Sequence, residues 1–568
     1  MKEKTLLLPE LLAPAGTPEA LTAALRGGAD AVYLGGRLLN ARMRAKNFDD
    51  SALRDAVLRC HDAGSRIYVT LNTIVFDREC DEAIRYAAFL YESGVDALIV
   101  SDLGLASSIK KYIPDFELHA STQLSSHNHL AGIELEKRGF SRMVVARELS
   151  RENIRSTVEK SPIEIEMFVH GALCVSHSGQ CLCSWAMGGR SGNRGECAQP
   201  CRMKYSGNHP LSLRDNCLAF HLRDIIDSGV ASLKIEGRLK SPDYVYSVTS
   251  TYRRLLDERR NATKSEIDKM ARVFSRDGFT DGYFEGKIDQ KMLGMRAENQ
   301  KSERSEKFFD LSHGKKYEIN REKVSLPEGK IEFDSVPPVK IKQNTARFYN
   351  VKSIPKSAES FFSRIYLPLE RYEKANSVCD GVLMPPVIPD SEIEKVEIQL
   401  KEAFDKGARH AMVGNIGHIA LAKKHGYVCH GDYRLNAANR GTLAAIADEF
   451  EDIILSPELT LPRLRDITGA KAAIVYGYLP LMTLEKSVMR SEIRDEKGVV
   501  FRIINEGGRD ILLNSAPIWM ADREKDLRDA FIFNRHFIFT TESAAECERV
   551  IVGYTEKREM KGNFKRIK

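Results

Sequence analysis

A dense group of cysteines is the feature of this sequence best suited to chemistry. The chain has 568 residues and eleven cysteines, and five of these lie between positions 174 and 201. An odd cysteine count in a chain that we expect to remain in a reducing compartment argues against a disulfide framework. Clustered thiols of this kind indicate metal ligands or redox groups.

Four of the cysteines have a spacing that suits a metal centre: Cys174, Cys181, Cys197 and Cys201. Four thiolates in tetrahedral arrangement are typical of zinc or an iron–sulfur cluster. Zinc sites usually pair cysteines that are two to four residues apart, and only Cys197 and Cys201 are that close. The spacing therefore leaves zinc and iron–sulfur open.

Two alternatives concern the same segment. Cys183 or Cys217 can replace one of the four ligands if the loop rearranges. A single catalytic thiol is the other functional interpretation, because Cys174 with His170 or His177 makes a nucleophile–base pair. A thiol peptidase, however, does not require several cysteines in one loop.

The sequence pattern predicts an α/β fold for the elements that position these residues. Short β-rich runs alternate with amphipathic segments, as in βα units. Eight such runs predict an N-terminal (β/α)8 TIM-like barrel, with an open doubly wound sheet as the alternative. The runs are 10–15, 30–35, 66–72, 97–102, 117–123, 142–149, 164–171 and 232–238.

Alternation along these runs selects the side chains that face the lumen of the barrel. In the seventh run Glu166 and His170 share the polar face, and in the eighth Glu236 and Arg238 do so. In the fifth run His119 has the same placement. The cysteines follow the seventh run, at the C-terminal mouth where barrel enzymes have their active sites.

The rest of the chain suggests two further units. A polar stretch leads into a small β-rich insert, so the predicted domains are 1–300, 301–355 and 356–568. The last of these is a partial repeat of the barrel with a basic C-terminal tail: HASTQL is echoed by HGDYRL, ARELS by SPELT and FVHGALC by IVYGYLPL. Pro480 stands where the first copy has Cys174. The second copy therefore cannot repeat the chemistry of the first.

Composition sets broad limits. Charged residues make up 29% and the net charge is +6, which permits a polyanionic partner without requiring one. No long uncharged apolar run suggests a membrane span or a signal peptide, so we expect a cytoplasmic protein with no membrane partner. HExxH, GxxxxGK[ST] and GxSxG patterns are absent from the sequence.

Several motifs resemble peptidase family U-32, the collagenase-like peptidases. They include LLAPAG, YLGG, HASTQ, GALC and SLKIEGRLKSPDYV, together with the pair Cys197 and Cys201. One position departs from the family pattern, because Cys183 stands where an aliphatic residue is preferred. The long form with a second barrel copy is similar to the ribosomal RNA cytidine hydroxylases of the family.

The resemblance implies a specific chemistry. Such proteins are iron–sulfur enzymes that hydroxylate C5 of a pyrimidine in 23S ribosomal RNA or transfer RNA, with prephenate as a possible co-substrate. The implied partners are RNA and the iron–sulfur assembly machinery. Under this implication we expect the second half to act as an RNA-docking platform whose removal spares the cluster. The family name keeps a peptidase open as the alternative.

The resemblance also implies roles for residues. Cys174, Cys181, Cys197 and Cys201 would hold a 4Fe–4S cluster, with zinc as the alternative metal and Cys217 as a substitute ligand. The pocket beneath would have proton-transfer groups and an arginine that anchors a carboxylate or phosphate. These pocket residues are His119, Glu166, His170, Glu236 and Arg238.

Overall fold

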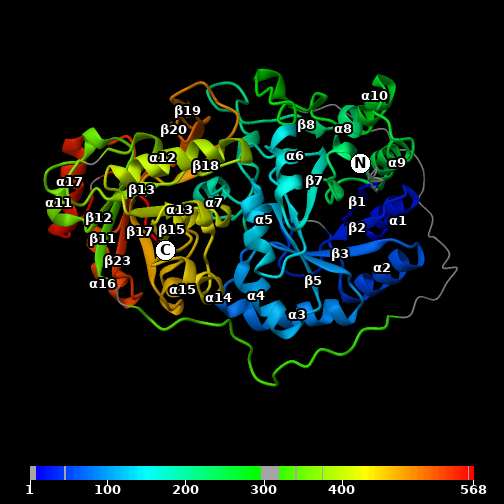
Figure 1. The fold of residues 1–568 in the computed structure, drawn as a ribbon, viewed down its shortest axis with the longest axis horizontal. Coiled ribbons are helices and arrows are strands. Elements are labelled where there is room, and N and C mark those ends of the chain that lie inside the picture. Colours follow the sequence, from blue (N-terminus) through cyan, green and yellow to red (C-terminus); the bar gives the residue numbers. More distant parts are fainter. Residues whose placement is uncertain are drawn as a thin grey trace.

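The first half of the chain closes into an eight-stranded parallel barrel (Figure 1). The structure is a computed structural model that describes residues 8–43, 46–295, 319–339, 342–373, 375–560 and 562–567. β9 pairs in parallel with both β1 and β7, which closes the sheet and confirms the predicted barrel over an open one. Its strands are β1 (Glu10–Ala15), β2 (Ala31–Leu34), β3 (Arg66–Leu71), β4 (Ala97–Val100), β5 (Glu117–Ala120), β6 (Arg142–Val144), β7 (Glu164–Gly171) and β9 (Ser232–Ile235).

Helices surround this barrel and begin at polar caps. Thr17 accepts a hydrogen bond from the backbone N–H of Ala20 and Pro18 occupies the first turn of α1, as N-terminal signals predict. Asp102 and Ser150 cap α4 and α6 in the same way. The helices are α1 (Pro18–Arg26), α2 (Asp50–Asp62), α3 (Cys80–Glu92), α4 (Leu103–Tyr112), α5 (His129–Glu136), α6 (Arg151–Lys160), α7 (Cys183–Gly188), α8 (Leu222–Asp227), α9 (Pro242–Asp257) and α10 (Lys264–Val273).

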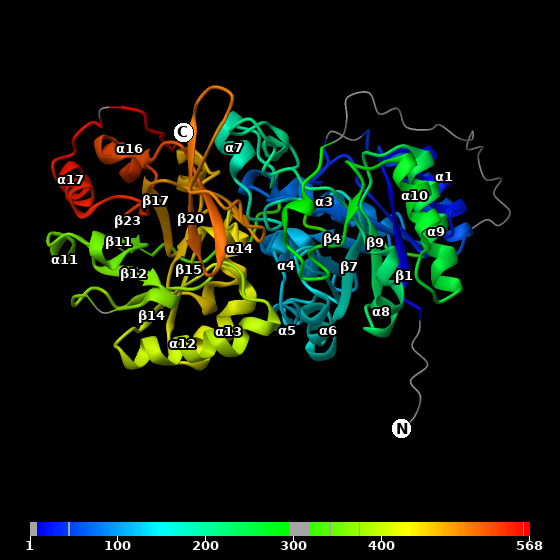
Figure 2. The same cartoon turned by 90° about the horizontal axis from the view of Figure 1, so that it is seen from above.

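The second half forms another closed parallel barrel, which confirms the predicted repeat (Figure 2). β23 pairs with β11 and with β17, so this copy has all eight strands. The strands are β11 (Gln343–Phe348), β12 (Arg364–Pro368), β13 (Gly381–Leu383), β14 (His410–Val413), β15 (Val428–Gly431), β16 (Ile453–Ile454), β17 (Lys471–Gly477) and β23 (Asn534–Phe539). Its helices are α11 (Ala358–Phe361), α12 (Ile393–Asp405), α13 (Ile419–Lys424), α14 (Arg440–Ala445), α15 (Leu461–Asp466), α16 (Glu524–Asp529) and α17 (Ala544–Thr555).

A separate antiparallel sheet follows the seventh strand of the second barrel. It consists of β18 (Pro480–Leu484), β19 (Glu492–Arg494), β20 (Val500–Glu506) and β21 (Arg509–Leu513). The first barrel has the cysteine segment after its own seventh strand. The two copies therefore carry their largest insertions at equivalent places.

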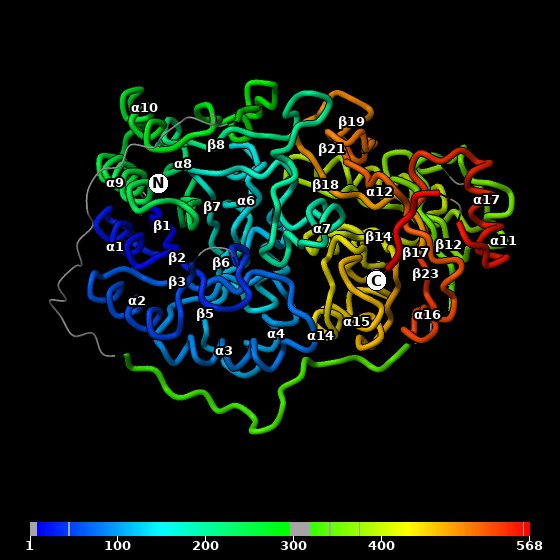
Figure 3. Tube along the Cα trace, turned by 180° about the vertical axis from the view of Figure 1, so that it is seen from behind, coloured from blue at the N-terminus to red at the C-terminus, as the bar shows by residue number. Residues whose placement is uncertain are grey.

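The predicted β-rich insert between the halves is not observed. Residues 319–339 run as an extended connection along the edge of both barrels and contain no strand (Figure 3). The strand found next, β11, is the first strand of the second barrel, so that unit begins near residue 343. β-rich composition alone could not separate an insert from a barrel strand. Residues 296–318 lie outside the described part of the chain.

The basic tail is packed on the second barrel. The backbone N–H of Lys565 donates to Pro517 O at 2.8 Å, and Arg566 pairs with Asp522. The described part of the tail is therefore held against the barrel despite its basic composition. Lys561 and Lys568 lie outside the described residues. In the described part of the chain, no helix has the length and apolar character needed to cross a membrane.

The barrels pack through reciprocal contacts of repeated residues. Gly104 lies on the N-terminus of α14, where an added Cβ would come within 2.5 Å of Thr442 N. Its counterpart Gly417 lies on the N-terminus of α5, where a Cβ would come within 2.6 Å of Asn128 Oδ1. Glycine is required at both places because backbone approaches backbone or a cap so closely. The halves therefore meet with approximate twofold symmetry.

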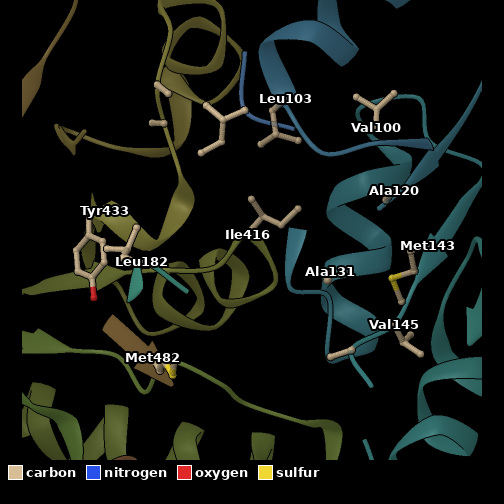
Figure 4. Close-up of a cluster of buried hydrophobic side chains, with 14 of the residues drawn as sticks. Val100, Leu103, Ala120, Ala131, Met143, Val145, Leu182, Ile416, Tyr433 and Met482 are labelled. Carbon is tan, nitrogen blue, oxygen red and sulfur yellow. The ribbon is translucent and has the colours of Figure 1, made fainter. Parts of the chain in front are cut away.

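One hydrophobic core continues across this contact. Figure 4 shows Leu103 and Ala131 of the first barrel near Ile416 of the second, and Leu182 of the cysteine segment near Tyr433. All five are buried. A boundary filled with apolar side chains fixes the relative position of the two halves.

Candidate functional site

The cysteine loop, residues 172–214, leaves the C-terminal end of β7 and lies at the mouth of the first barrel. Ile74 N, just after β3, donates to Asn193 O at 3.1 Å, and Arg147, after β6, donates to Ser178 Oγ at 3.1 Å. All eleven cysteines of the chain are free. The thiols therefore lie at the end of the barrel where the sequence placed them.

Five thiols of this loop influence one another. Burial raises the pKa of Cys174 and Cys181, and the neighbouring cysteines raise it further. Burial and the neighbouring Cys174 and Cys197 thiols raise the pKa of Cys201 to about 12. Cys183 is buried at the start of α7, and Cys197 is exposed. Buried, mutually repelling thiolates require a cation to be stable together.

The spacing of the sulfur atoms tests which metal suits them. A tetrahedral zinc site with bonds of 2.3 Å holds its sulfurs about 3.8 Å apart. In the described part of the chain, no three cysteine sulfurs lie within 4.8 Å of one another. A cluster with several irons binds each thiolate through a different iron and so separates them more. The described sulfurs are therefore not arranged as the ligands of a single tetrahedral zinc ion.

Cys217 lies apart from the loop cysteines. It is in β8 (Asp215–Cys217), which pairs antiparallel with the end of β7, and its Sγ lies 3.9 Å from the Tyr252 hydroxyl on α9. Burial raises its pKa to about 11. This position among outer-helix residues favours Cys201 over Cys217 as a ligand.

The second barrel holds one side of the cysteine loop. His177 N donates to Thr483 O at 2.9 Å and Leu182 N donates to Leu481 O at 2.8 Å, both on β18. Further along, Ser206 N donates to Arg494 O on β19 at 2.7 Å. The antiparallel sheet of the second half therefore extends onto the loop through backbone hydrogen bonds.

Side chains fix the glycine-rich middle of the loop. Glu458 of the second barrel accepts hydrogen bonds from Ser191 and from Asn193 Nδ2. Arg194 binds both carboxylate oxygens of Glu79 at 2.7 Å, from the first barrel. Arg194 thus joins the cysteine loop to the first barrel through Glu79. Its guanidinium is therefore occupied and cannot bind the phosphate backbone of a nucleic acid.

At the mouth of the first barrel a carboxylate, Glu236, lies among three arginines. Glu236 lies 3.1 Å from Arg42 and 3.5 Å from Arg147, and Arg238 also acts on it. Burial opposes ionisation of Glu236, but the arginines prevail and lower its pKa to about 2. Burial lowers the pKa of Arg238 to about 10. The local charge is positive, which suits an anionic ligand.

Two arginines of this pocket were missed by sequence reasoning. Arg42 follows β2 and lies in the NAR motif, and Arg147 follows β6 in ARELS and stacks on Phe168 at 4.0 Å. Arg42 lies outside the predicted runs, whereas Arg147 lies in the run 142–149 but beyond the end of β6 at Val144. The strand-alternation rule therefore did not select them.

Two predicted pocket residues lie deeper in the lumen. Glu166 is fully buried, 2.7 Å from Lys234 Nζ and 3.4 Å from Arg142. His119 Nε2 lies 2.9 Å from Glu117 Oε1, towards the N-terminal end of the strands. Both face the lumen as predicted. They lie below Phe168, whereas Glu236 and Arg238 lie above it at the mouth.

His170 does not face the lumen, contrary to the prediction. The β7–β9 register shifts between Phe168 and His170, and this bulge turns the ring towards the outer helices. There it packs against Tyr252 of α9 and Phe279, with ring centroids 5.7 and 5.0 Å away. Neither ring nitrogen has a hydrogen-bond partner in the described structure, and burial lowers the pKa to about 3. The structure therefore separates His170 from the pocket.

His177 and Glu148 form a buried pair beside the loop that sequence reasoning did not assign to the pocket. His177 Nε2 lies 3.0 Å from Glu485 Oε2, and its Nδ1 lies 3.6 Å from Glu148. Burial raises the pKa of Glu148. Glu485 therefore holds Nε2 of His177, and Nδ1 faces Glu148 without a hydrogen bond among the described residues, which argues against pairing of His177 with Cys174 as a catalytic base.

Comparisons with known proteins find relatives of about half of the chain, and the family match falls on the first barrel. Residues 16–294 match the sequence profile of the family described as Peptidase family U32. Over 286 residues, 48% of this chain, the sequence is 42% identical to the 23S rRNA 5-hydroxycytidine C2501 synthase of Escherichia coli. That match covers 42% of the relative, so the chain spans less than half of its length.

Two further relatives match over most of their own length. The tRNA hydroxylation protein P1 of Bacillus subtilis is 36% identical over 314 residues, which is 51% of this chain and 74% of the relative. A protein of Porphyromonas gingivalis named Collagenase is 33% identical over 308 residues, which is 49% of this chain and 73% of that protein.

Proposed function

Because the chain belongs to peptidase family U32, we propose that it is an iron–sulfur-dependent RNA hydroxylase that acts at C5 of a pyrimidine. The substrate is ribosomal RNA, with transfer RNA as the alternative. Relatives named for hydroxylation of both RNA classes support this proposal. The reaction would take place in the cytoplasm, where RNA and the iron–sulfur assembly machinery are the partners.

The observation that carries the proposal is the set of free thiols at the barrel mouth that also holds Glu236 and its arginines. Cys174, Cys181, Cys197 and Cys201 would hold a 4Fe–4S cluster, and the free state of all four thiols supports this choice. Such a cluster supplies one-electron chemistry that no protein side chain here offers. The exposure of Cys197 leaves one edge of the site open to a large substrate.

The pocket residues have separate tasks in this proposal. Arg42, Arg147 and Arg238 bind an anionic co-substrate, for which prephenate, a dicarboxylate, is the candidate. Glu236 orients the guanidinium groups of Arg42 and Arg147 and stays ionised, since its pKa is about 2. A carboxylate held in that state is an anchor rather than a proton-transfer group at neutral pH.

The substrate base must reach the mouth of the barrel from outside. A base within a duplex cannot enter, so it must be single-stranded or flipped out of the stack. The cysteine loop and the sheet β18–β21 of the second barrel border that entrance together. The second half thus contributes to the rim of the site as well as to any RNA contact.

A thiol peptidase, the alternative suggested by the relative named Collagenase, receives less support from the geometry. His170 faces the outer helices, and His177 is paired with Glu485 and Glu148. Cys174 therefore lacks a histidine positioned as its base.

Nucleoside mass spectrometry tests the proposal. Ribosomal and transfer RNA from a strain that lacks the gene should lose one hydroxylated pyrimidine, which returns when the gene is restored. Unchanged hydroxypyrimidine levels in both RNA pools would contradict the proposal. Cleavage of peptides by purified protein without iron would support the peptidase instead.

A further inference from the structure

The lower lumen of the second barrel holds a pair of histidines that the first barrel lacks. Strand register places His430 where the first barrel has His119, because Met412 pairs with His430 as Ile99 pairs with His119. By the same register His410, the first residue of β14, stands where the first barrel has Ala97. The repeat thus gained an imidazole at this position.

The charges around the histidines have also changed. In the first barrel His119 pairs with Arg142, a cation held by carboxylates. The equivalent position beside His430 is Asp452, which precedes β16, and the residue before it is Glu451. Asp452 and Glu451 thus stand in place of Arg142 and Ser141, while Val428 stands in place of Glu117. The exchange removes one cation and adds one carboxylate, which favours a bound cation.

The geometry matches the needs of a divalent transition metal. His410 Nδ1 lies 3.0 Å from His430 Nε2, and His430 Nε2 lies 3.5 Å from Glu451 Oε2. One ligand atom from each of the three residues lies within 4.8 Å of the other two. Tetrahedral ligands at zinc–nitrogen bond length are about 3.3 Å apart. The observed separations bracket that value.

A neighbouring carboxylate prepares His430 as a ligand. His430 Nδ1 lies 2.5 Å from Asp452 Oδ1, and Asp452 is itself held by Asn534 and by Gln343 at 3.2 Å. A proton on Nδ1 leaves the lone pair of Nε2 directed at His410. Histidines that bind metals are usually oriented by such a carboxylate on the other ring nitrogen.

One side chain competes for the same place. Arg364 Nη1, at the start of β12, lies 3.2 Å from His430 Nε2, and Arg364 Nε lies 3.5 Å from Asp380 Oδ1. A metal at the histidines would displace the guanidinium, and Asp380 is close enough to receive it. Arg364 therefore weakens binding of the metal without blocking the ligand atoms.

We propose that His410, His430 and Glu451 bind one divalent transition-metal ion of the zinc type at the N-terminal end of the second barrel. Glu451 is exposed, so the site opens to solvent, and water completes the coordination. The site ties together the ends of β14 and β15 and the turn before β16. It lies at the end of this barrel remote from the mouth, and its existence does not depend on the RNA chemistry proposed above.

Cobalt(II) titration of the full-length protein, freed of metal by a chelator, tests the site. Co²⁺ at histidine and carboxylate ligands gives visible ligand-field bands, whereas binding by the cysteine loop adds thiolate charge-transfer absorption. We expect wild type to bind one ion more than His410→Ala, counted by mass spectrometry. His410→Ala restores the alanine of the first barrel, so the fold should tolerate it.

Variants at Asp452 and Arg364 should change the affinity for the metal in opposite directions. Asp452→Asn should weaken binding about 10–100-fold, the usual effect of removing a carboxylate behind a ligand histidine. Arg364→Gln should strengthen binding because it removes the competitor, and His425→Ala, a histidine outside the site, should change nothing. Equal metal counts in wild type and His410→Ala, with equal melting temperatures, would overturn the proposal.

Discussion

Glu458 of the second barrel accepts a hydrogen bond of 3.0 Å from Asn193 in the cysteine loop of the first. In the internal repeat Glu458 stands where the first barrel has Glu148, whose carboxylate oxygens have no hydrogen-bond partner among the described residues. The same position has therefore taken a different role in each copy. The described part of the second barrel has no counterpart of the cysteine loop and instead positions the loop of the first.

Glu458→Ala should loosen the cysteine loop. Ser191 and Asn193 would lose their buried acceptor, which costs on the order of 2 kcal/mol. We expect lower iron content after anaerobic reconstitution and a faster loss of iron to a chelator, both measured by iron assay. Glu394→Ala, an exposed residue on α12, is the matched control. Iron retention identical to that of the control would contradict a positioning role for Glu458.

Arg147→Ala should weaken binding of an anionic co-substrate. Its guanidinium lies 3.5 Å from Glu236 and over the Phe168 ring, so its loss removes one of three positive charges from the pocket. A charged hydrogen bond contributes about 1.5–3 kcal/mol, which corresponds to about 10–100-fold in Kd. Calorimetric titration with prephenate measures the change. Arg147→Lys keeps the charge but loses the planar stacking, so an intermediate effect is expected; an unchanged Kd in Arg147→Ala would exclude this pocket as the anion site.

Glu236 should make stability depend on pH in acid. Its pKa falls from an ordinary 4.5 to about 2 in the folded protein. The stabilisation is therefore fully present above pH 4.5 and is lost as pH falls from 4.5 towards 2, by about 3 kcal/mol in total. Glu236→Gln should be less stable than wild type at pH 6, and the two should converge near pH 2. Urea unfolding across this range checks it, and parallel curves would contradict the assigned ion pairs.

His170→Phe should keep the RNA modification and resist acid. The ring lies among Tyr252 and Phe279, where phenylalanine fits and has no unpaired nitrogens. The pKa of His170 falls from 6.5 to about 3, so wild type loses stability as pH drops through that range, whereas the variant does not. Thermal melts at pH 7 and pH 5 measure the difference. Loss of RNA modification in a folded His170→Phe would restore the role that the sequence suggested.

The strands of the first barrel could be predicted because each is a short β-rich run between helices with clear caps. Their closure, and the lumen placement of Glu166 and Glu236, followed from alternation. The alternation rule placed His170 on the wrong face because a bulge in β7 adds one residue after Phe168. Nothing in the sequence marks this bulge. Arg42 and Arg147 were missed because loop conformation, not strand period, brings them to Glu236.

The role of the second half could not be predicted from the sequence. Contacts such as Leu182 with Leu481 and Asn193 with Glu458 join residues more than 260 positions apart. The repeat suggested a removable platform for RNA. Because β18 and Glu458 hold the cysteine loop, removal of the second half should instead destabilise any cluster bound there.

The most direct test is complementation of a strain that lacks the gene, followed by nucleoside mass spectrometry of its RNA. Wild type and Cys217→Ser should restore the hydroxylated pyrimidine, because Cys217 lies against Tyr252 and apart from the loop thiols. Cys201→Ser should leave it absent and lower the iron content of the purified protein. Full restoration by Cys201→Ser, or no change in RNA on loss of the gene, would contradict an iron–sulfur RNA hydroxylase.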